Sequence, residues 1–273
     1  MTGTLAGKTI VMSGGSRGIG LAIALRAARD GANVVLLAKT DRPHPKLPGT
    51  VHTAAGEIER AGGQALAVVG DVRSDEDVRA VVDRAVERFG GVDIVVNNAS
   101  ALDVSGSERL TMKSYDLMQD INVRGTFLLS TTAVPHLRAA ANPHILTLSP
   151  PLNLAPHWLG RHPGYLLSKY GMSLATLGLA AEFADAGIAA NTLWPRTLID
   201  TAAVRNLLGG SGRTRSPEIV ADAAHTILTR KARECTGNTF IDEEVLAAEG
   251  VTDLSRYRPA DATGELEPDI FLD

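Results

Sequence analysis

Cysteine is almost absent from this chain of 273 residues, which contains only Cys235. No disulfide can form within the chain, so we expect a protein of a reducing compartment, and the cytoplasm is the predicted location. Long apolar runs are also missing, and the first residues contain no hydrophobic signal region. We therefore expect no membrane-spanning segment and no membrane partner.

An excess of positive charge is lacking as well, since 27 Lys and Arg residues stand against 31 Asp and Glu residues. A net charge of −4 provides no field that would hold nucleic acid, so no nucleic-acid partner is predicted. The seven histidines form no pair at ligand spacing with Cys or Glu, which argues against a zinc site. No Gly-x-Ser-x-Gly sequence marks a hydrolase nucleophile.

Short apolar runs alternate with helical patterns along the whole chain, and 44% of the residues are hydrophobic. We expect strands near residues 9–12, 33–38, 65–69, 94–97, 144–149, 188–193 and 239–241. We expect helices near residues 19–29, 53–61, 75–89, 111–137, 164–184 and 217–229. This order predicts an α/β fold with a doubly wound parallel sheet in a single domain, residues 1–273, with an extended tail from about residue 251.

A glycine-rich stretch, Ser-Gly-Gly-Ser-Arg-Gly-Ile-Gly at residues 13–20, joins the first predicted strand to the first predicted helix. Glycine lets the backbone approach a ligand closely, and the free N–H groups of a new helix suit a pyrophosphate. The spacing differs from the GxGxxG fingerprint and lacks the GK[ST] ending of a P-loop. By itself the stretch could equally be a turn that packs the helix on the strand.

Two cations lie where a dinucleotide would place its adenosine ribose. Lys39 ends the second predicted strand, and Arg17 lies in the glycine-rich stretch. An acidic residue after this strand holds the ribose 2′-hydroxyl, whereas a basic one suits a 2′-phosphate. The two cations therefore favour NADP(H). NAD(H) is the alternative, because Asp41 is close by. Both cations could also be ordinary solvated charges that bind no cofactor.

Polar residues follow the later strands, where ligands bind in open α/β sheets. Asp71 and Val72 follow the third strand, and Asn98 and Ala99 follow the fourth. Each could equally cap a helix or stabilise a turn. Asn122 interrupts an apolar helical pattern, which predicts a local kink or a hydrogen-bonded core amide.

Tyr165 and Lys169 share one face of a predicted helix, one turn apart. An ammonium near a phenol favours the phenolate and lowers the phenol pKa, so the pair could exchange protons with a substrate. A hydroxyl such as that of Ser149, at the end of the fifth predicted strand, could hold a carbonyl oxygen meanwhile. In isolation, however, a Tyr-x-x-x-Lys pair is more often a plain helix face.

Taken together in this order, these motifs resemble the short-chain dehydrogenase/reductase family, from about residue 5 to residue 241. The resemblance implies Tyr165 as the acid/base, Lys169 as its partner on the nicotinamide ribose, Ser149 as the group that orients the substrate, and Asn122 in a proton relay. It implies a cofactor site formed by Gly14, Ser16, Arg17, Gly18, Ile19, Gly20, Lys39, Asp71, Val72, Asn98, Ala99, Tyr165, Lys169, Pro195 and Thr197.

The chain departs from the family pattern after the sixth strand, where Pro-Gly is replaced by Pro195-Arg196. Arg196 could meet an anionic substrate or point outward. The threonine expected to meet the nicotinamide carboxamide is either Thr197 or Thr201. The spacing between Ser149 and Tyr165 is longer than usual, which predicts a reshaped substrate pocket.

The resemblance implies an NADP(H)-dependent oxidoreductase that interconverts a carbonyl and a secondary alcohol on a small molecule. The alternative is a catalytically weak NADP(H)-binding sensor or lipid-ligand binder. We also expect a homodimer or homotetramer, because the predicted helices 111–137 and 164–184 carry more apolar residues than one buried face needs.

Overall fold

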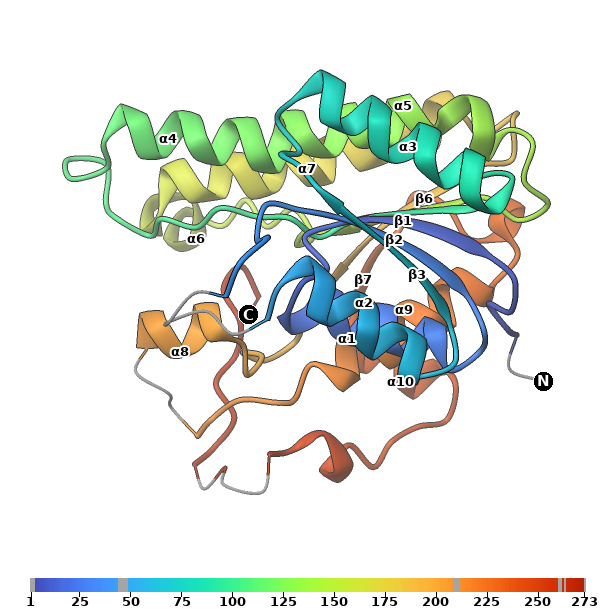
Figure 1. Ribbon diagram of the computed structural model, residues 1–273. Coiled ribbons are helices and arrows are strands. Elements are labelled where there is room, and N and C mark those ends of the chain that lie inside the picture. Colours follow the sequence, from blue (N-terminus) through green and yellow to red (C-terminus); the bar gives the residue numbers. More distant parts are fainter. Residues whose placement is uncertain (1–2, 44–48, 209–211, 260–261, 263, 273) are drawn as a thin grey trace.

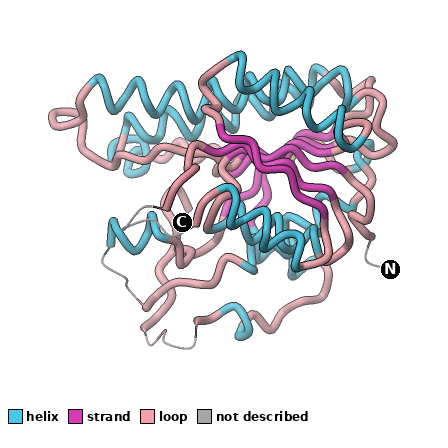
Figure 2. Tube along the Cα trace, in the orientation of Figure 1, coloured by secondary structure: helices cyan, strands magenta, loops and turns pink. Residues whose placement is uncertain are grey.

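The computed structural model describes residues 3–43, 49–208, 212–259, 262 and 264–272. The three prolines of residues 42–50 predict an irregular surface loop, and part of this segment lies outside the described residues. Seven strands form one parallel sheet in the order β3-β2-β1-β4-β5-β6-β7 (Figures 1 and 2). They are β1 (Thr9–Ser13), β2 (Asn33–Ala38), β3 (Gln64–Val69), β4 (Ile94–Asn97), β5 (His144–Leu148), β6 (Ala189–Trp194) and β7 (Thr239–Ile241). The predicted fold class is confirmed.

Helices cover both faces of this sheet (Figure 1). On one face lie α1 (Gly18–Ala28), α2 (Val51–Arg60), α9 (Glu218–Thr229) and α10 (Asp242–Ala248); on the other lie α3 (Asp75–Phe89), α5 (Gly125–Leu137) and α7 (Pro163–Glu182). The central strands are apolar and buried along their length, because both of their faces are covered. Shorter helices are α4 (Met112–Met118), α6 (Pro156–Arg161) and α8 (Ala202–Leu208).

The single helix predicted over residues 111–137 is wrong in detail. The structure has α4, then a π-helical turn at Gln119–Arg124, then α5. Asn122 lies in this turn and is fully buried. Its side chain accepts a hydrogen bond from the Ala101 N–H at 2.7 Å and donates to Ala101 O and to Ser168 Oγ. The interruption therefore ties the loop after β4 to α7, consistent with both a kink and a satisfied amide.

The C-terminal tail returns to the carboxyl ends of the strands. Pro268 forms an antiparallel bridge with Thr197, and the Leu198 N–H donates to Glu267 O at 2.9 Å. Phe271 lies 1% exposed among the rings of Trp158, Tyr165, Tyr170 and Trp194. This aromatic cluster fixes the tail beside the start of α7.

Candidate active site

A cavity of about 1040 Å³ lies at the carboxyl ends of the strands. This is where open α/β sheets bind their ligands, and the volume is at the upper end of ordinary ligand pockets. Segments from the glycine-rich stretch, from β2, β5 and α7, from the loops after β3 and β4, and from the C-terminal tail line it together. Thirteen of the seventeen site residues predicted from the sequence line this cavity.

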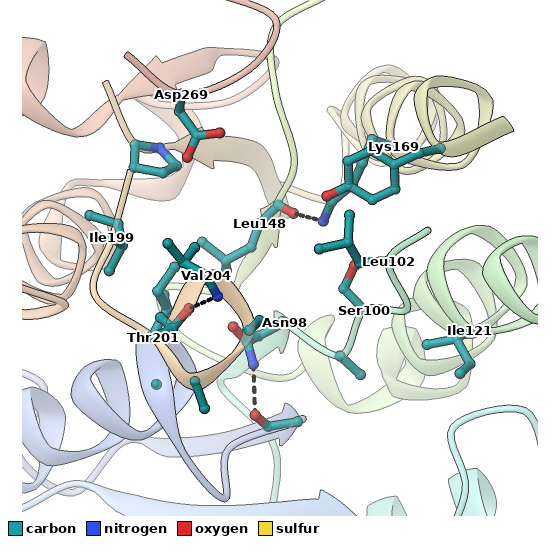
Figure 3. Close-up of a pocket in the computed structure, with 18 of the residues that line it drawn as sticks. Asn98, Ser100, Leu102, Ile121, Leu148, Lys169, Ile199, Thr201, Val204 and Asp269 are labelled. Atoms are coloured by element: carbon teal, nitrogen blue, oxygen red, sulfur yellow. Dashed lines mark hydrogen bonds between the residues drawn. The ribbon is translucent and has the colours of Figure 1, made fainter. Parts of the chain in front are cut away.

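At one end of the cavity, the glycine-rich stretch has no room for side chains. A Cβ on Gly14 would lie 2.8 Å from Ala99 Cα, and a Cβ on Gly20 would lie 2.5 Å from Asn98 Nδ2. Gly14 also has φ of +75°, a conformation that side chains strongly disfavour. Asn98 Nδ2 donates to Gly14 O at 2.7 Å, as Figure 3 shows. Asn98 therefore holds the turn in shape as well as lining the cavity.

The two predicted cations line the same end of the cavity. Arg17 donates to Thr40 Oγ1 at 3.2 Å and to Gly49 O at 3.0 Å. Lys39 is more than half exposed and pairs with Asp71 at 3.1 Å. A hydrogen bond from Arg73 holds the pKa of Asp71 well below its usual range. Lys39 lowers this pKa further, whereas burial raises it. A bound phosphate would therefore find Arg17 and Lys39 in the cavity lining but would compete with Asp71 for Lys39.

These features fit a dinucleotide. No side chain caps the N-terminus of α1, which is a helix of eleven residues, and two cations line the cavity beside this N-terminus. Val72, Ile19 and Ser16 line the cavity beside them. The glycine-rich stretch and Arg17 would hold the phosphates, and Asp71 and Val72 would lie beside the adenosine.

At the other end of the cavity lie Tyr165 and Lys169, both from α7 and both buried. Lys169 Nζ donates to Leu148 O at 2.8 Å and lies 5.1 Å from the centre of the Trp194 ring. Burial lowers the pKa of Lys169 to about 7, against the opposing effect of Asp269. Burial and the Asp269 carboxylate raise the pKa of Tyr165 above its usual value.

The direction of the Tyr165 shift is opposite to the one expected from the sequence. An ammonium one helical turn away was expected to lower the phenol pKa. In the structure the cost of burying the phenolate outweighs that attraction, and the Lys169 ammonium is itself disfavoured by burial. Tyr165 is therefore protonated at neutral pH, which suits a group that gives a proton away.

Four predicted site residues do not line the cavity, namely Gly20, Asn122, Ser149 and Thr197. Ser149 follows the last residue of β5 and is fully buried, and its hydroxyl accepts a hydrogen bond from Ser173 Oγ at 3.0 Å. Alternation along the strand turns Leu148 toward the cavity and Ser149 toward α7. The Ser149 hydroxyl thus contacts Ser173 on α7, next to a residue that lines the cavity.

The two threonines after β6 that were considered for the nicotinamide carboxamide lie in different surroundings. Thr201 lines the cavity and accepts a hydrogen bond from the Val204 N–H, whereas Thr197 bridges to Pro268 (Figure 3). The Arg196 guanidinium forms an ion pair with Glu244, and Arg196 is not among the residues that line the cavity. Pro195 lines the cavity as predicted.

Sequence reasoning missed Asp269. This residue comes from the tail, lines the cavity and faces the side of α7 that carries Lys169 (Figure 3). Burial raises the pKa of Asp269 to about 7, with a further upward effect from Asp242 and a downward one from Lys169. No local signal in the sequence could have revealed it, because Asp269 lies about 100 residues from Tyr165 and follows no strand or helix signature.

Two further features were looked for among the described residues, a metal-binding group and a membrane-spanning helix. Within the described ranges no group of His, Cys, Asp and Glu could hold a metal ion. None of the helices that the structure describes is long and apolar enough to cross a membrane.

The chain matches the short chain dehydrogenase family model over residues 8–209. It is 53% identical to hydroxysteroid dehydrogenase-like protein 2 of Xenopus laevis, over 100% of this chain and 65% of that protein. The chain therefore spans 65% of the length of this relative.

Solved structures resemble it as well. A short chain dehydrogenase of Mycobacterium thermoresistibile is 56% identical, with a TM-score of 0.94 over 99% of this chain and 96% of that one. L-Sorbose reductase of Gluconobacter frateurii, solved with NADPH and L-sorbose, is 27% identical, with a TM-score of 0.76 over 88% and 97%. With its parallel sheet, its glycine-rich turn and its Tyr165–Lys169 pair, this chain belongs to the short-chain dehydrogenase/reductase family of oxidoreductases.

Proposed function

We propose that the protein is an NADP(H)-dependent oxidoreductase that interconverts a carbonyl and a secondary alcohol on a small molecule. The observation that supports this most directly is one continuous cavity that joins the Arg17–Lys39 end to the Tyr165–Lys169 end. Bound nicotinamide would supply or accept the hydride, which is chemistry that the side chains lining this cavity cannot perform.

Tyr165 is the proposed acid/base. Its phenol is protonated at neutral pH, because burial and Asp269 raise its pKa, so it is ready to protonate the oxygen of a carbonyl that is being reduced. Lys169 stands next to it on the same helix face and would bind the ribose of the cofactor. Asn122 and Ser149 remain predicted contributors on the family resemblance alone, through a proton relay and through substrate orientation.

The preference for NADP(H) over NAD(H) rests on Arg17 and Lys39. Both line the cavity at the end of β2, where an acidic residue would favour the 2′-hydroxyl of NAD(H). A 2′-phosphate would gain two cations and would release Lys39 from Asp71.

The substrate end of the cavity is mostly apolar. Its walls include Leu102, Val104, Trp158, Leu198 and Ile270. This lining favours a substrate with a sizeable hydrocarbon part next to its carbonyl. The relatives' name points to a hydroxysteroid, but they carry additional length, so the substrate of this chain stays open to a panel test.

A second candidate function is binding without turnover. The fully buried Ser149 hydroxyl favours it, because the hydroxyl expected to orient a substrate is engaged by Ser173. In this case the chain would be an NADP(H)-binding sensor or a lipid-ligand binder.

We further propose a homodimer or homotetramer in a reducing compartment such as the cytoplasm. Five large apolar side chains on α4, α5 and α7 are exposed, namely Met112, Leu117, Phe127, Leu167 and Leu174. Exposed apolar side chains gathered on neighbouring helices are typical of an interface. Light scattering at micromolar concentration tests this, and a monomer would refute it.

The proposed function is tested by nicotinamide absorbance with a panel of ketones, aldehydes, 3-oxoacyl thioesters and secondary alcohols, each with NADP(H) and with NAD(H). The Tyr165→Phe variant is the blank. We expect it to lose turnover by about 1,000-fold, within the range for a general acid, while NADPH fluorescence titration shows nearly unchanged binding. Full activity in this variant would refute the mechanism, and saturable NADPH binding with a silent panel would favour the binding protein.

A further inference from the structure

The segment between Ser149 and Tyr165 gives the substrate end of the cavity a wall of its own. It contains α6, which lies beside the first turns of α7 (Figure 1). Trp158 and Arg161 of α6 both line the cavity. Trp158 is buried, whereas Arg161 is exposed. This wall therefore consists of a buried aromatic ring and a cation at the rim, where the cavity meets the solvent.

Arg161 is held in place by this ring. Its guanidinium carbon, Cζ, lies 5.6 Å from the centre of the Trp158 ring, within the range of a cation–π interaction. The Trp158 ring lies 6.0 Å from the Phe271 ring, and the Phe271 ring is stacked on the Tyr165 ring at 6.1 Å. Packing thus connects the guanidinium to the acid/base through two intervening rings, and the two groups lie at separate places in one cavity.

The N–H donors of the Arg161 side chain have no acidic partner among the residues that the structure describes. The other cations in the lining differ from it, because Arg17 and Lys169 donate to oxygens of the chain and Lys39 pairs with a carboxylate. A guanidinium has five N–H donors in a planar fork that matches a carboxylate or a phosphate. The fork of Arg161 is therefore available to an anion that enters the cavity.

The other titratable groups at this end of the lining do not take up the charge of Arg161. Glu267 pairs with Arg213 at 3.4 Å, and Asp269 accepts a backbone N–H at 2.7 Å. His162 lines the cavity next to Arg161, but burial and the charge of Arg161 lower its pKa, so His162 is neutral at pH 7. An anion at this part of the rim would therefore meet one cation, Arg161.

We propose that Arg161 is a specificity-determining residue that binds the anionic group of an amphipathic carbonyl substrate at the rim of the cavity. The hydrocarbon part of this substrate lies along the apolar wall, and its carbonyl reaches Tyr165. The anionic group is a carboxylate or a phosphate, because both match the guanidinium fork. This inference names the substrate class of the proposed function and rests on it.

The exposure of Arg161 determines the size of the effect. An ion pair in contact with solvent is weak and is screened by salt, whereas a forked pair with a guanidinium that is already held in place is stronger. We therefore expect kcat/KM to be about tenfold higher for an anionic substrate than for a neutral one of the same length. This preference should decrease as the salt concentration rises.

The first test measures kcat/KM with NADPH for two matched pairs of substrates. One pair is a medium-chain oxo acid and its methyl ester. The other pair is a 3-oxoacyl thioester of coenzyme A and the same acyl thioester of N-acetylcysteamine, which lacks the phosphates. A preference for the anion in the first pair alone identifies a carboxylate as the ligand of Arg161, and a preference in the second pair alone identifies a phosphate.

Arg161→Gln removes the charge and keeps much of the length of the side chain. We expect it to lower the anionic-to-neutral ratio of kcat/KM by about tenfold, through a higher KM for the anion. Arg161→Lys should keep part of the ratio, because lysine retains the charge and loses the fork. Arg138→Gln is the matched control, since Arg138 is also exposed, lies 5.4 Å from the centre of the Phe183 ring and does not line the cavity.

Three results would overturn the proposal. The first is a wild-type ratio close to one in both pairs. The second is a ratio that Arg161→Gln leaves unchanged. The third is an equal loss in Arg161→Gln and Arg138→Gln, because it would mean that a change of net charge anywhere on the surface has the same effect.

The second test needs no turnover. Both tryptophans of the chain line the cavity, so their fluorescence reports its occupation. The complex with oxidised NADP is titrated with decanoate, decyl phosphate and methyl decanoate, each below its micelle concentration. We expect at least one of the two anions to bind about tenfold more tightly than the ester, and Arg161→Gln to remove the difference.

Equal affinities for all three probes in the wild type would overturn the proposal, even if the panel finds a carbonyl that is reduced. A silent panel together with tighter binding of an anion through Arg161 would instead count against the proposed function alone. The two failures are therefore distinguishable.

Discussion

The two ends of the cavity are built in different ways. The cofactor end is centred on consecutive residues of a strand, a turn and a helix, with short segments that follow β2, β3 and β4 beside them. Its glycines are needed because Asn98 and Ala99 leave no space for a Cβ. The substrate end comes from α7 and from a tail about 100 residues further along the chain, joined by the ring of Phe271. The first end is determined by local geometry, and the second depends on tertiary packing.

This difference explains which features could be predicted. The strand–turn–helix signature, Lys39 after β2 and the Tyr165–Lys169 pair are short-range patterns with a physical reason for their spacing. They gave the fold class, the strand order in the chain and thirteen of the residues that line the cavity. Mutations at the two ends should therefore separate cofactor binding from turnover.

The largest effect is expected at the substrate end, from Phe271→Ala. Phe271 is buried against both tryptophans of the chain, Trp158 and Trp194, and the substitution leaves a cavity in this cluster. We expect a loss of about 3 kcal/mol in the stability of the tail, as for other Phe→Ala changes. Tryptophan fluorescence measures the release of the tail, and turnover should fall while NADPH affinity at the other end is retained.

The matched variant is Phe271→Leu, which keeps an apolar side chain in the cluster. It should recover most of the fluorescence and of the turnover. Unchanged emission in the Ala variant, or a loss of NADPH affinity equal to the loss of turnover, would show that the two ends are not independent.

A smaller effect is expected far from both ends, from Asp30→Asn. Burial alone would raise the pKa of Asp30, but hydrogen bonds from the Leu5 N–H, His225 and Arg26 lower it to about 2. A depressed pKa contributes stability that is present above the unfolded pKa near 4 and is lost as the pH falls through about 2. We expect Asn to lower the free energy of unfolding by about 2 kcal/mol at neutral pH.

Urea unfolding at neutral pH and at about pH 3 measures this contribution. The difference between wild type and Asp30→Asn should shrink at the lower pH, because the wild type also begins to lose the charge. An equal difference at both pH values would contradict the assignment. Since Asp30 lies outside the cavity lining, this variant also shows what a general loss of stability does to cofactor binding and to turnover.

The failures of prediction have physical causes of their own. The hydrophobic period over residues 111–137 continues through the π-helical turn, because only one residue of register is gained there, so the pattern predicted one helix with a local kink or a buried amide at Asn122 and not the division into α4 and α5. The fifth strand was expected to include Ser149, but β5 ends one residue earlier and the Ser149 hydroxyl contacts Ser173; its role in orienting a substrate stays a prediction. Asp269 and Phe271 have no local signature, since their surroundings exist only after the tail has packed.

The smallest effect is expected at the cofactor end, from Lys39→Ala. Lys39 is more than half exposed and is shared with Asp71, so its interaction with a phosphate is partly screened. We expect NADPH affinity to fall about tenfold and NADH affinity to change by less than about twofold, because only NADPH carries the 2′-phosphate. Fluorescence titration of both cofactors measures the two affinities, and Lys8→Ala is the control, since Lys8 pairs with Asp93 outside the cavity lining. Equal losses for both cofactors would mean that Lys39 supports the turn and not the 2′-phosphate, and the preference for NADP(H) would then rest on Arg17 alone.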